Sequence, residues 1–215
     1  MAEAVFFDLD GTLADTGPDL AGALNRLLLE EGRTAMAYAL LRPHVSAGAR
    51  GLLRAGFNIT PVAPHYIELR ARFLDLYEAS LCVDTVLFPG MAEVLVALEA
   101  RGTRWGVVTN KPERFTRPLM EALGLTRRAA AIVSGDTTAK PKPDPLPLLH
   151  ACAQVGIAPQ TSVYVGDDLR DIEAGRAAGM RTIAAAWGYL GDGLPVDAWG
   201  ADCQIATPAD LLVNL

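Results

Sequence analysis

The sequence predicts an α/β fold, a doubly wound parallel sheet with a helical segment inserted after the first strand. Short runs of apolar, β-branched and aromatic residues recur along the chain and are typical of buried strands. From residue 87 onward they alternate with segments of helical periodicity, which indicates right-handed crossovers. Between residues 15 and 82 nothing alternates like a strand. We therefore expect a discontinuous core of residues 1–14 and 83–215, with an all-helical insertion over residues 15–82.

The first strand sets the frame for the rest of the chain. Residues 5–7, Val-Phe-Phe, predict a buried strand, which puts Asp8 at its carboxyl end and Asp10 in the turn that follows. Gly11 allows the chain to turn sharply there. In an open α/β sheet, ligands bind at the edge formed by the carboxyl ends of the strands. Two carboxylates crowded at that edge indicate that a cation is held there.

The insertion is predicted to contain two clear helices. The first begins near Pro18, has Asp19 in its first turn and ends near Gly32, with leucines at helical spacing in between. Residues 34–58 have a helical pattern that a proline and several glycines interrupt. The second helix follows a proline-containing loop, and its apolar face is expected to consist of Ile67, Leu69, Phe73, Leu76 and Tyr77.

The remaining strands and helices follow in alternation. Further strands are predicted over residues 105–109, 130–134, 162–166 and 181–186, with residues 203–205 as a weaker candidate. Helices are predicted to begin at Pro89-Gly90, Pro112, Pro145 and Asp171, with a last helix from Pro208 to Val213. Proline near a helix start and glycine after a helix end are the usual boundary residues.

Length, charge and cysteine usage narrow the class of protein. The 215 residues carry a net charge of −6, which argues against general nucleic-acid binding but allows a small anionic substrate. The chain has no long apolar run and no basic N-terminal region, so we expect neither a membrane span nor an export signal. Cys82, Cys152 and Cys203 are scattered, as is typical of reduced cysteines in the cytosol. We expect a cytoplasmic monomer or homodimer.

Four predicted strand ends carry polar groups, and in a parallel sheet they open at the same edge. They supply Asp8 and Asp10; Thr109, Asn110 and Lys111; Lys140 and Lys142; and Asp167, Asp168 and Asp171. Five carboxylates that face one or two lysines require further positive charge. The expected cofactor is Mg²⁺, a hard cation that takes carboxylate oxygens, waters and a substrate phosphate as ligands. The sequence has no His or Cys cluster that would indicate zinc.

This set of groups suits phosphoryl transfer. An ionised carboxylate beside Mg²⁺ can attack phosphorus and form an aspartyl phosphate. The metal and a lysine neutralise the phosphoryl oxygens, while a second acid protonates the leaving alkoxide and then activates water. Free backbone N–H groups of the helix predicted from Pro112 would point at the phosphate. The sequence therefore predicts a phosphomonoester hydrolase that acts on a small phosphorylated metabolite.

Four motifs resemble those of the haloacid dehalogenase (HAD) superfamily, in its phosphatase branch. They are Asp8-Leu-Asp10-Gly11-Thr12, Thr109, Lys142-Pro143 and Gly166-Asp167-Asp168, and their order and spacing match over essentially the whole chain. The resemblance implies a HAD-like, Rossmann-like core. It also implies that Asp8 is the nucleophile. Asp10 would be the general acid/base and would give a metal ligand through its carbonyl.

The same resemblance implies roles for the other strand-end residues. Thr109 and Asn110, together with Thr12, would bind the phosphoryl group, and Lys142 would bridge the nucleophile and the phosphate. Lys142, which Pro-Asp-Pro follows, fits the family pattern better than Lys140. The Mg²⁺ site would consist of Asp8, Asp10 and Asp167, with Asp168 and Asp171 as indirect or water-mediated partners.

The helical insertion resembles the small cap of the phosphoglycolate phosphatase group. Such caps act as lids that exclude water and contact the leaving group. Residues 46–51, with Arg50 as their single cation, have the composition expected of a substrate-facing loop, although a solvated arginine at a helix end is an equally good interpretation. Other stretches, such as residues 105–112, are similar to bacterial enzymes that act on N-acetylmuramic acid 6-phosphate. The substrate, 2-phosphoglycolate or N-acetylmuramic acid 6-phosphate, stays open at this point.

Four alternative functions are weighed against this prediction. A phospho-receiver domain also gathers aspartates, a Thr or Ser and a lysine at such an edge, but it is shorter and has no helical insertion. A sugar phosphomutase of the same fold would pass the phosphoryl group to a sugar rather than to water. A binding protein without turnover would be expected to lack one of Asp8, Asp10 or Asp167, all of which are present, and a dehalogenase would lack Asp10.

Overall fold

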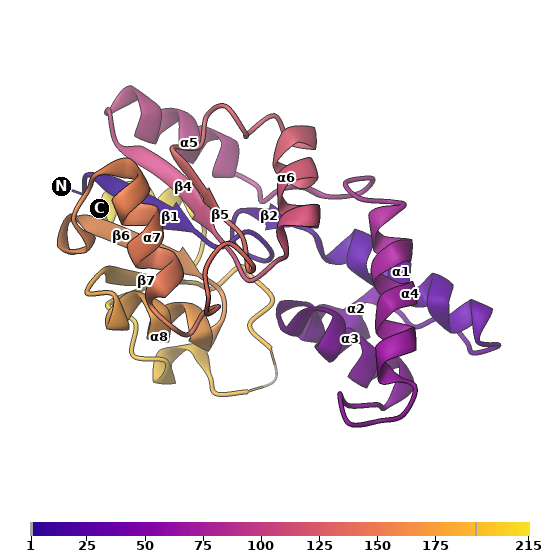
Figure 1. Cartoon of the computed structure of the whole chain (residues 1–215). Coiled ribbons are helices and arrows are strands. Elements are labelled where there is room, and N and C mark those ends of the chain that lie inside the picture. Colours follow the sequence, from indigo (N-terminus) through magenta and orange to yellow (C-terminus); the bar gives the residue numbers. More distant parts are fainter. Residues whose placement is uncertain (1, 192) are drawn as a thin grey trace.

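The computed structural model describes residues 2–191 and 193–215, and its centre is a six-stranded parallel sheet (Figure 1). In sheet order, the strands are β5 (Ala131–Val133), β4 (Arg104–Val108), β1 (Ala4–Phe7), β6 (Ser162–Gly166), β7 (Arg181–Ala185) and β8 (Cys203–Ile205). The predicted α/β class and parallel sheet are confirmed. Because β1 lies between β4 and β6, the residues that follow these three strands meet at one edge.

Both faces of the sheet are covered by helices. Val5 and Phe7 belong to one buried cluster, while Ala4 and Phe6 belong to another on the opposite face. This two-sided burial explains why β1 is apolar at every position rather than alternating. The helices of the core are α5 (Met91–Ala100), α6 (Glu113–Ala122), α7 (Leu146–Val155) and α8 (Leu169–Ala177). Buried residues of α5 and α6 join the first cluster, and those of α7 join the second.

The helical insertion lies to one side of the sheet (Figure 1). Its elements are α1 (Gly17–Glu30), α2 (Tyr38–Leu41), the 3₁₀ helix η1 (Arg42–Ala47), α3 (Gly48–Phe57) and α4 (Tyr66–Glu78). Within it, α1 packs against both α3 and α4. No helix among residues 2–191 and 193–215 combines the length and apolar character needed to cross a membrane.

Four details differ from the sequence-based expectations. The chain enters and leaves the insertion through a short antiparallel ribbon, β2 (Ala14–Asp15) and β3 (Val86–Leu87), because two-residue strands are too short to show a periodicity. Helix α8 begins at Leu169 rather than Asp171, since Asp168 caps it. The segment Pro208–Val213 is a 3₁₀ helix, η4. Ile67 is 79% exposed and does not belong to the apolar face of α4.

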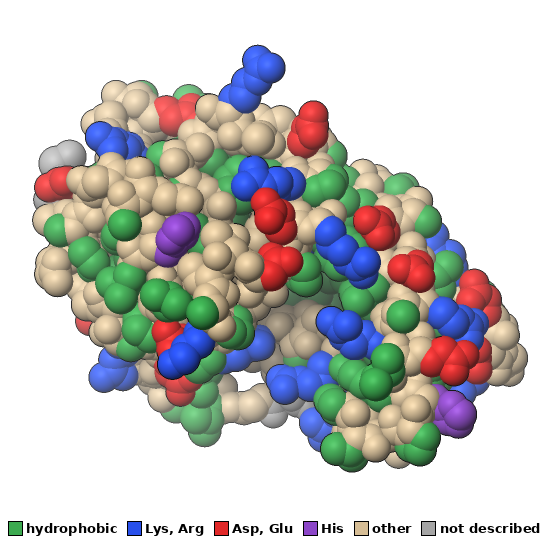
Figure 2. Space-filling model, in the orientation of Figure 1, with side chains coloured by type: hydrophobic (Ala, Val, Ile, Leu, Met, Phe, Trp, Pro, Cys, Tyr) green, Lys and Arg blue, Asp and Glu red, His purple; other side chains and the backbone are tan. Residues whose placement is uncertain are grey.

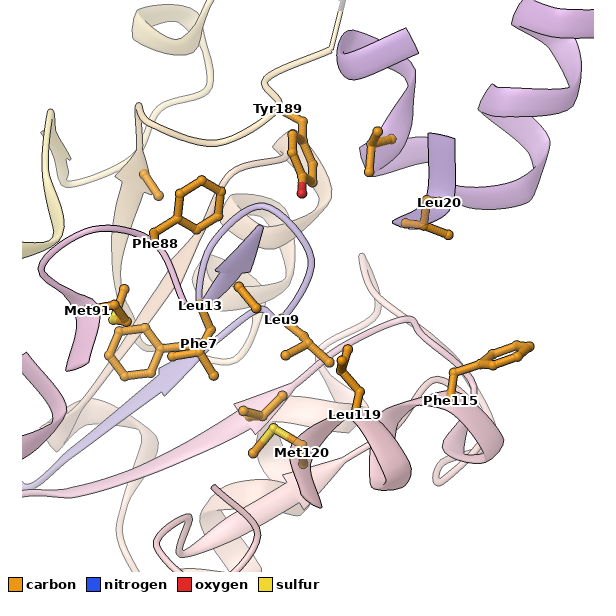
Figure 3. Close-up of a cluster of buried hydrophobic side chains, with 14 of the residues drawn as sticks. Phe7, Leu9, Leu13, Leu20, Phe88, Met91, Phe115, Leu119, Met120 and Tyr189 are labelled. Atoms are coloured by element: carbon orange, nitrogen blue, oxygen red, sulfur yellow. The ribbon is translucent and has the colours of Figure 1, made fainter. Parts of the chain in front are cut away.

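The turn that carries Asp10 is anchored by apolar side chains on both of its sides. Leu9 and Leu13 are fully buried. Figure 3 shows them among Phe7 of β1 and Leu119 of α6, in the cluster that also contains Met91 and Phe88. Burial of a leucine side chain contributes about 1.5–3 kcal/mol. The polar residues of this turn are therefore held on a rigid apolar base.

The junction between core and insertion is tied by one buried carboxylate. Asp19, in the first turn of α1, accepts backbone N–H bonds from Val83 (3.1 Å), Asp84 (2.9 Å) and Thr85 (3.0 Å). The Thr85 hydroxyl donates a fourth bond to it at 2.6 Å. This carboxylate joins the first helix of the insertion to the segment by which the chain returns to the core.

Replacement of Asp19 is expected to destabilise the whole protein. Asp19→Ala leaves three backbone donors without their acceptor, and the free energy of unfolding should fall by ~3 kcal/mol. Urea unfolding followed by circular dichroism measures it. The matched control is Asp197→Ala on the exposed surface, which should change stability by less than about 0.5 kcal/mol. Equal effects of the two substitutions would contradict this account of the junction.

Candidate active site

Three carboxylates converge at the carboxyl ends of β1 and β6. Asp8 follows β1 and Asp167 follows β6, and these strands pair in register, with Phe7 opposite Val165. Asp171, in the first turn of α8, completes the group. Carboxylate oxygens of Asp8, Asp167 and Asp171 all lie within 4.8 Å of one another. Residues more than 150 positions apart in the chain are thus brought to one point by the parallel pairing.

Lys142 is the cation at the centre of this cluster. Its Nζ lies 2.9 Å from Asp8 Oδ1 and 2.7 Å from Asp171 Oδ1. It also donates to the Val108 carbonyl at 3.0 Å and to the Tyr164 hydroxyl at 2.7 Å. Burial alone would lower the pKa of Lys142, but the carboxylates of Asp171 and Asp8 outweigh it and raise that pKa. Lys142 is therefore a fixed positive charge.

Asp167 is fully buried and held from three directions. It accepts hydrogen bonds from the Thr12 hydroxyl (2.8 Å), the Tyr189 backbone N–H (2.9 Å) and the Ser46 hydroxyl of the insertion (3.1 Å). Gly11 has φ +90°, and a Cβ there would lie 2.2 Å from Asp167 Oδ2, so only glycine fits. Burial, followed by the charges of Asp8 and Asp171, raises the pKa of Asp167 well above its usual range.

Asp10 lies apart from the three-carboxylate cluster and has its own partners. Lys111 Nζ is 3.0 Å from Asp10 Oδ1, and the Thr16 hydroxyl donates to the same oxygen at 2.5 Å. Burial alone would lower the pKa of Lys111, but the charge of Asp10 more than offsets it. The Lys111 ammonium also lies 4.6 Å from the ring centre of Tyr77, on α4 of the insertion. The Asp10 side chain is thus oriented by contacts from both the core and the insertion.

Thr109 and Asn110 follow β4, and Asn110 fixes the backbone at one of the two candidate lysines, Lys142. Thr109 is buried and lines the cavity described below. The Asn110 side chain bonds both the carbonyl and the N–H of Lys142, at 2.9 Å each, and so fixes the backbone that carries this lysine. Lys140 is exposed and pairs with Asp144 at 3.2 Å. Of the two lysines, Lys142 is the one at the carboxylates.

The remaining acidic residues are engaged in local contacts. Asp168 caps α8, where its carboxylate accepts from the Arg170 backbone N–H at 2.9 Å, and it pairs with the Arg170 guanidinium at 2.7 Å. Burial opposes ionisation of Asp168, yet the bonds from Arg170 lower its pKa. Arg170 in turn donates to the Ser46 carbonyl at 2.7 Å. Asp168 therefore orients Arg170 and does not belong to the three-carboxylate cluster.

The start of helix α6 differs from the expectation of free N–H groups that face a phosphate. The first of them, the Glu113 N–H, donates to the Asp136 carboxylate at 2.8 Å. Pro112, which has no N–H, precedes it and lines the cavity. The contribution of this helix end to anion binding is therefore smaller than the sequence suggests.

The acidic cluster has the donor set that a hard divalent cation requires. Asp8 Oδ1 is buried and, within residues 2–191 and 193–215, has no hydrogen-bond donor, its contact being the ion pair with Lys142. Three carboxylates share one lysine, so the cluster has an excess of negative charge. Oxygen ligands of this kind suit Mg²⁺. Asp8, Asp167 and Asp171 are the side chains that could hold such an ion.

A cavity of about 300 Å³ lies between this cluster and the insertion. Its floor contains Asp8, Asp10, Thr109, Asn110, Lys111 and Lys142, and its opposite wall contains Arg50, Tyr66, Arg70, Phe73 and Tyr77. Figure 2 shows Lys and Arg side chains along the hollow between the two lobes. The volume is at the lower end of the range for small-molecule sites. Arg50, one of the sequence candidates, thus faces the cluster across a cavity.

Several residues at the site had no predicted role. Lys111 contacts Asp10, Arg170 contacts Asp168 and the Tyr189 N–H bonds Asp167, while Arg70 lines the cavity. The signal for Lys111 was its place beside Thr109 and Asn110 at a strand end. Thr12 is present at the site, but its hydroxyl is bonded to Asp167, and its role in binding phosphate stays a prediction.

Comparisons with known proteins agree with this geometry. The chain is 43% identical to an N-acetylmuramic acid 6-phosphate phosphatase of Pseudomonas putida, over 97% of its own length and 93% of that protein. It is 46% identical to a phosphoglycolate phosphatase of Xanthomonas campestris pv. campestris, over 97% and 94%. A crystal structure described as a predicted phosphoglycolate phosphatase from Haemophilus somnus 129pt matches with a TM-score of 0.86 and 28% identity, over 99% and 97% of the two chains. The model of the haloacid dehalogenase-like hydrolases matches residues 5–185. The chain belongs to the haloacid dehalogenase-like hydrolase family.

Proposed function

We propose that this hydrolase is a Mg²⁺-dependent phosphatase that cleaves a small phosphomonoester through an aspartyl-phosphate intermediate. The observation that carries the proposal is the setting of Asp8. Asp8 and Asp171 both line the cavity, but the Asp8 side chain is 14% exposed, whereas Asp171 is 2% exposed and Asp167 is fully buried. Asp8 is thus the carboxylate of the cluster that an incoming phosphate can approach. The Lys142 ammonium lies 2.9 Å from the Asp8 carboxylate, where it can neutralise both that carboxylate and the incoming phosphate.

In the first step of the proposed reaction, the Asp8 carboxylate attacks phosphorus while the bond from phosphorus to the leaving oxygen breaks. Asp10, held by Lys111 and Thr16, gives its proton to the leaving alkoxide. In the second step Asp10 takes a proton from water, which attacks the phosphorus of the aspartyl phosphate and releases inorganic phosphate. Asp8 is thereby regenerated.

The other residues of the site orient and neutralise. Thr109 and Asn110 bind the phosphoryl group, with Asn110 also fixing Lys142. Asp8, Asp167 and the Asp10 carbonyl would hold Mg²⁺, in line with the excess negative charge of the cluster. When bound, the ion supplies charge neutralisation and alignment of the phosphate. Asp171 acts through Lys142, which it contacts at 2.7 Å.

The insertion, residues 15–82, acts as a cap over a core of residues 1–14 and 83–215. Three contacts support this role, because they join the insertion to residues of the core at and near the site. Ser46 bonds Asp167, Arg170 bonds the Ser46 carbonyl, and Arg42 bonds the Trp187 carbonyl at 2.9 Å. A cap in this position excludes water from the phosphoryl group and contacts the leaving group.

The relatives' names indicate two candidate substrates, 2-phosphoglycolate and N-acetylmuramic acid 6-phosphate, both small phosphorylated metabolites of the kind found in the cytoplasm. With Mg²⁺ present, the purified protein is expected to release inorganic phosphate from an aryl phosphate and from at least one of these two. Hexose phosphates complete the panel. Failure to release phosphate from any of them would overturn the proposal. Isomerisation of a hexose phosphate without phosphate release would indicate a phosphomutase, and phosphorylation without turnover a receiver-like protein.

A further inference from the structure

A second cavity, of about 430 Å³, adjoins the first on the side away from Lys142. Ser46, Ala47, Arg50 and Asp168 line both cavities, so the two share a boundary. The second extends from helix α3 of the insertion to the chain that follows β7, where Leu194 and Trp199 line it. Together the two cavities form a site larger than a phosphate and a two-carbon acid require.

Two arginines, Arg50 and Arg54, line this second cavity. Arg50 and Arg54 lie four residues apart on α3, on the same face and ~6 Å apart along the axis. Within the described part of the chain, neither has a carboxylate within ion-pair distance. Among residues 2–191 and 193–215, Asp168 is the acidic residue that lines the cavity, and it is paired with Arg170. In a protein of net charge −6, this local excess of positive charge favours an anionic ligand.

The opposite wall is apolar. Trp199 is almost fully buried, and its indole N–H donates to the Leu194 carbonyl at 2.9 Å. The part of the ring that lines the cavity therefore offers an apolar surface to a ligand. Leu169 and Leu190, which pack in the same hydrophobic cluster as Trp199, continue this wall. A ligand that fits has a compact body with an apolar face and carries a negative group on the side toward α3.

We propose that the second cavity is a subsite for an anionic group on the leaving group of the substrate, and that Arg54 determines this specificity. The proposal rests on the phosphatase function proposed above and refines it. Arg54 lines the second cavity only, whereas Arg50 lines both. A carboxylate one carbon away from the phosphate ester oxygen stays in the first cavity. A carboxylate that reaches Arg54 must be separated from the phosphate by the body of a larger leaving group.

Two sugar phosphates make a matched pair for the test. N-acetylmuramic acid 6-phosphate and N-acetylglucosamine 6-phosphate differ by the lactyl ether that carries the carboxylate. Arg54→Ala is expected to lower kcat/KM for the first by about tenfold, the effect of losing one charge-assisted contact, through KM rather than kcat. The values for N-acetylglucosamine 6-phosphate and 2-phosphoglycolate should not change. Arg54→Lys, which keeps the charge, should restore most of the loss.

Stability measurements distinguish a structural role of Arg54 from its proposed role in substrate specificity. The residue lies in the last turn of α3, where a cation also stabilises the helix, so melting temperatures of all variants accompany the kinetics. Arg127→Ala, which removes an exposed arginine of the core, is the control for the loss of one positive charge. A structural defect would affect all three phosphates together, and that result would overturn the proposal.

Binding without turnover separates the subsite from the proposed function. In an Asp8→Asn background, calorimetry should show weaker binding of N-acetylmuramic acid 6-phosphate when Arg54→Ala is added, with no change for N-acetylglucosamine 6-phosphate. Unchanged binding of both would overturn the subsite even if the enzyme is a phosphatase. Absence of phosphate release by the wild-type protein, with the binding difference intact, would overturn the proposed reaction and leave the subsite supported.

Discussion

Asp8→Asn is expected to abolish phosphate release, with a loss in kcat of at least ~10⁴-fold, the scale seen when a catalytic nucleophile is removed. An amide is a poor nucleophile toward phosphorus, and it also removes one negative charge from the cluster around Lys142. The substitution preserves shape and leaves the apolar base of Leu9 and Leu13 intact. The far-UV circular dichroism spectrum should therefore be unchanged. Steady-state release of inorganic phosphate from an aryl phosphate is the measurement.

Detection of the covalent intermediate tests the assignment of Asp8 as nucleophile without relying on reaction rates. Brief mixing of the wild-type protein with substrate, followed by acid quench and peptide mass spectrometry, should find a phosphoryl group on the peptide that contains Asp8. The Asp8→Asn protein should show none. Asp84→Asn, the same chemical change on an exposed residue, should retain full turnover and labelling. Retained turnover in Asp8→Asn, or a label on another residue, would show that the nucleophile has been assigned wrongly.

The position of the acidic residues could be predicted because it depends on topology alone. Asp8 and Asp167 each end a strand whose apolar sequence identifies it, and parallel pairing carries both ends to the same edge. No side-chain detail enters this inference. The same reasoning predicted that Lys142 would lie near this edge, although it could not separate Lys142 from Lys140, which the structure directs to solvent.

The contacts that orient these residues could not be predicted, because they depend on where loops and the insertion pack. The Tyr189 N–H donates to Asp167 from the loop after β7, and the Ser46 hydroxyl of the insertion donates to the same carboxylate. A short 3₁₀ segment and a glycine-containing loop give no repeating apolar pattern in the sequence from which to infer which way a side chain faces. Arg54 shows the same difficulty. Its sequence context is that of any solvated helix arginine, and only the structure shows that it lines a cavity.

Removal of divalent ions is expected to silence the enzyme, and the adjacent residues Asp167 and Asp168 offer a way to locate the ion. EDTA should abolish turnover, and added Mg²⁺ should restore it. Asp167→Asn should raise the Mg²⁺ concentration for half-maximal activity by at least tenfold, since loss of one charged ligand costs more than ~1.4 kcal/mol. Asp168→Asn should leave that concentration nearly unchanged, because Asp168 bonds Arg170 and caps α8, and asparagine caps as well as aspartate.

Thermal stability gives a test of the ion that does not depend on catalysis. Asp8, Asp167 and Asp171 repel one another, so an ion that binds among them should stabilise the folded state selectively. At a Mg²⁺ concentration 100 times Kd the gain is about 2.7 kcal/mol, a rise in Tm of roughly 5–10 °C for a protein of this size. At the same Mg²⁺ concentration, the rise should persist in Asp168→Asn and fall to about half or less in Asp167→Asn. Since Asp167 is fully buried and Asp168 is its neighbour, an equal Mg²⁺ response in the two variants would mean that the ion binds elsewhere.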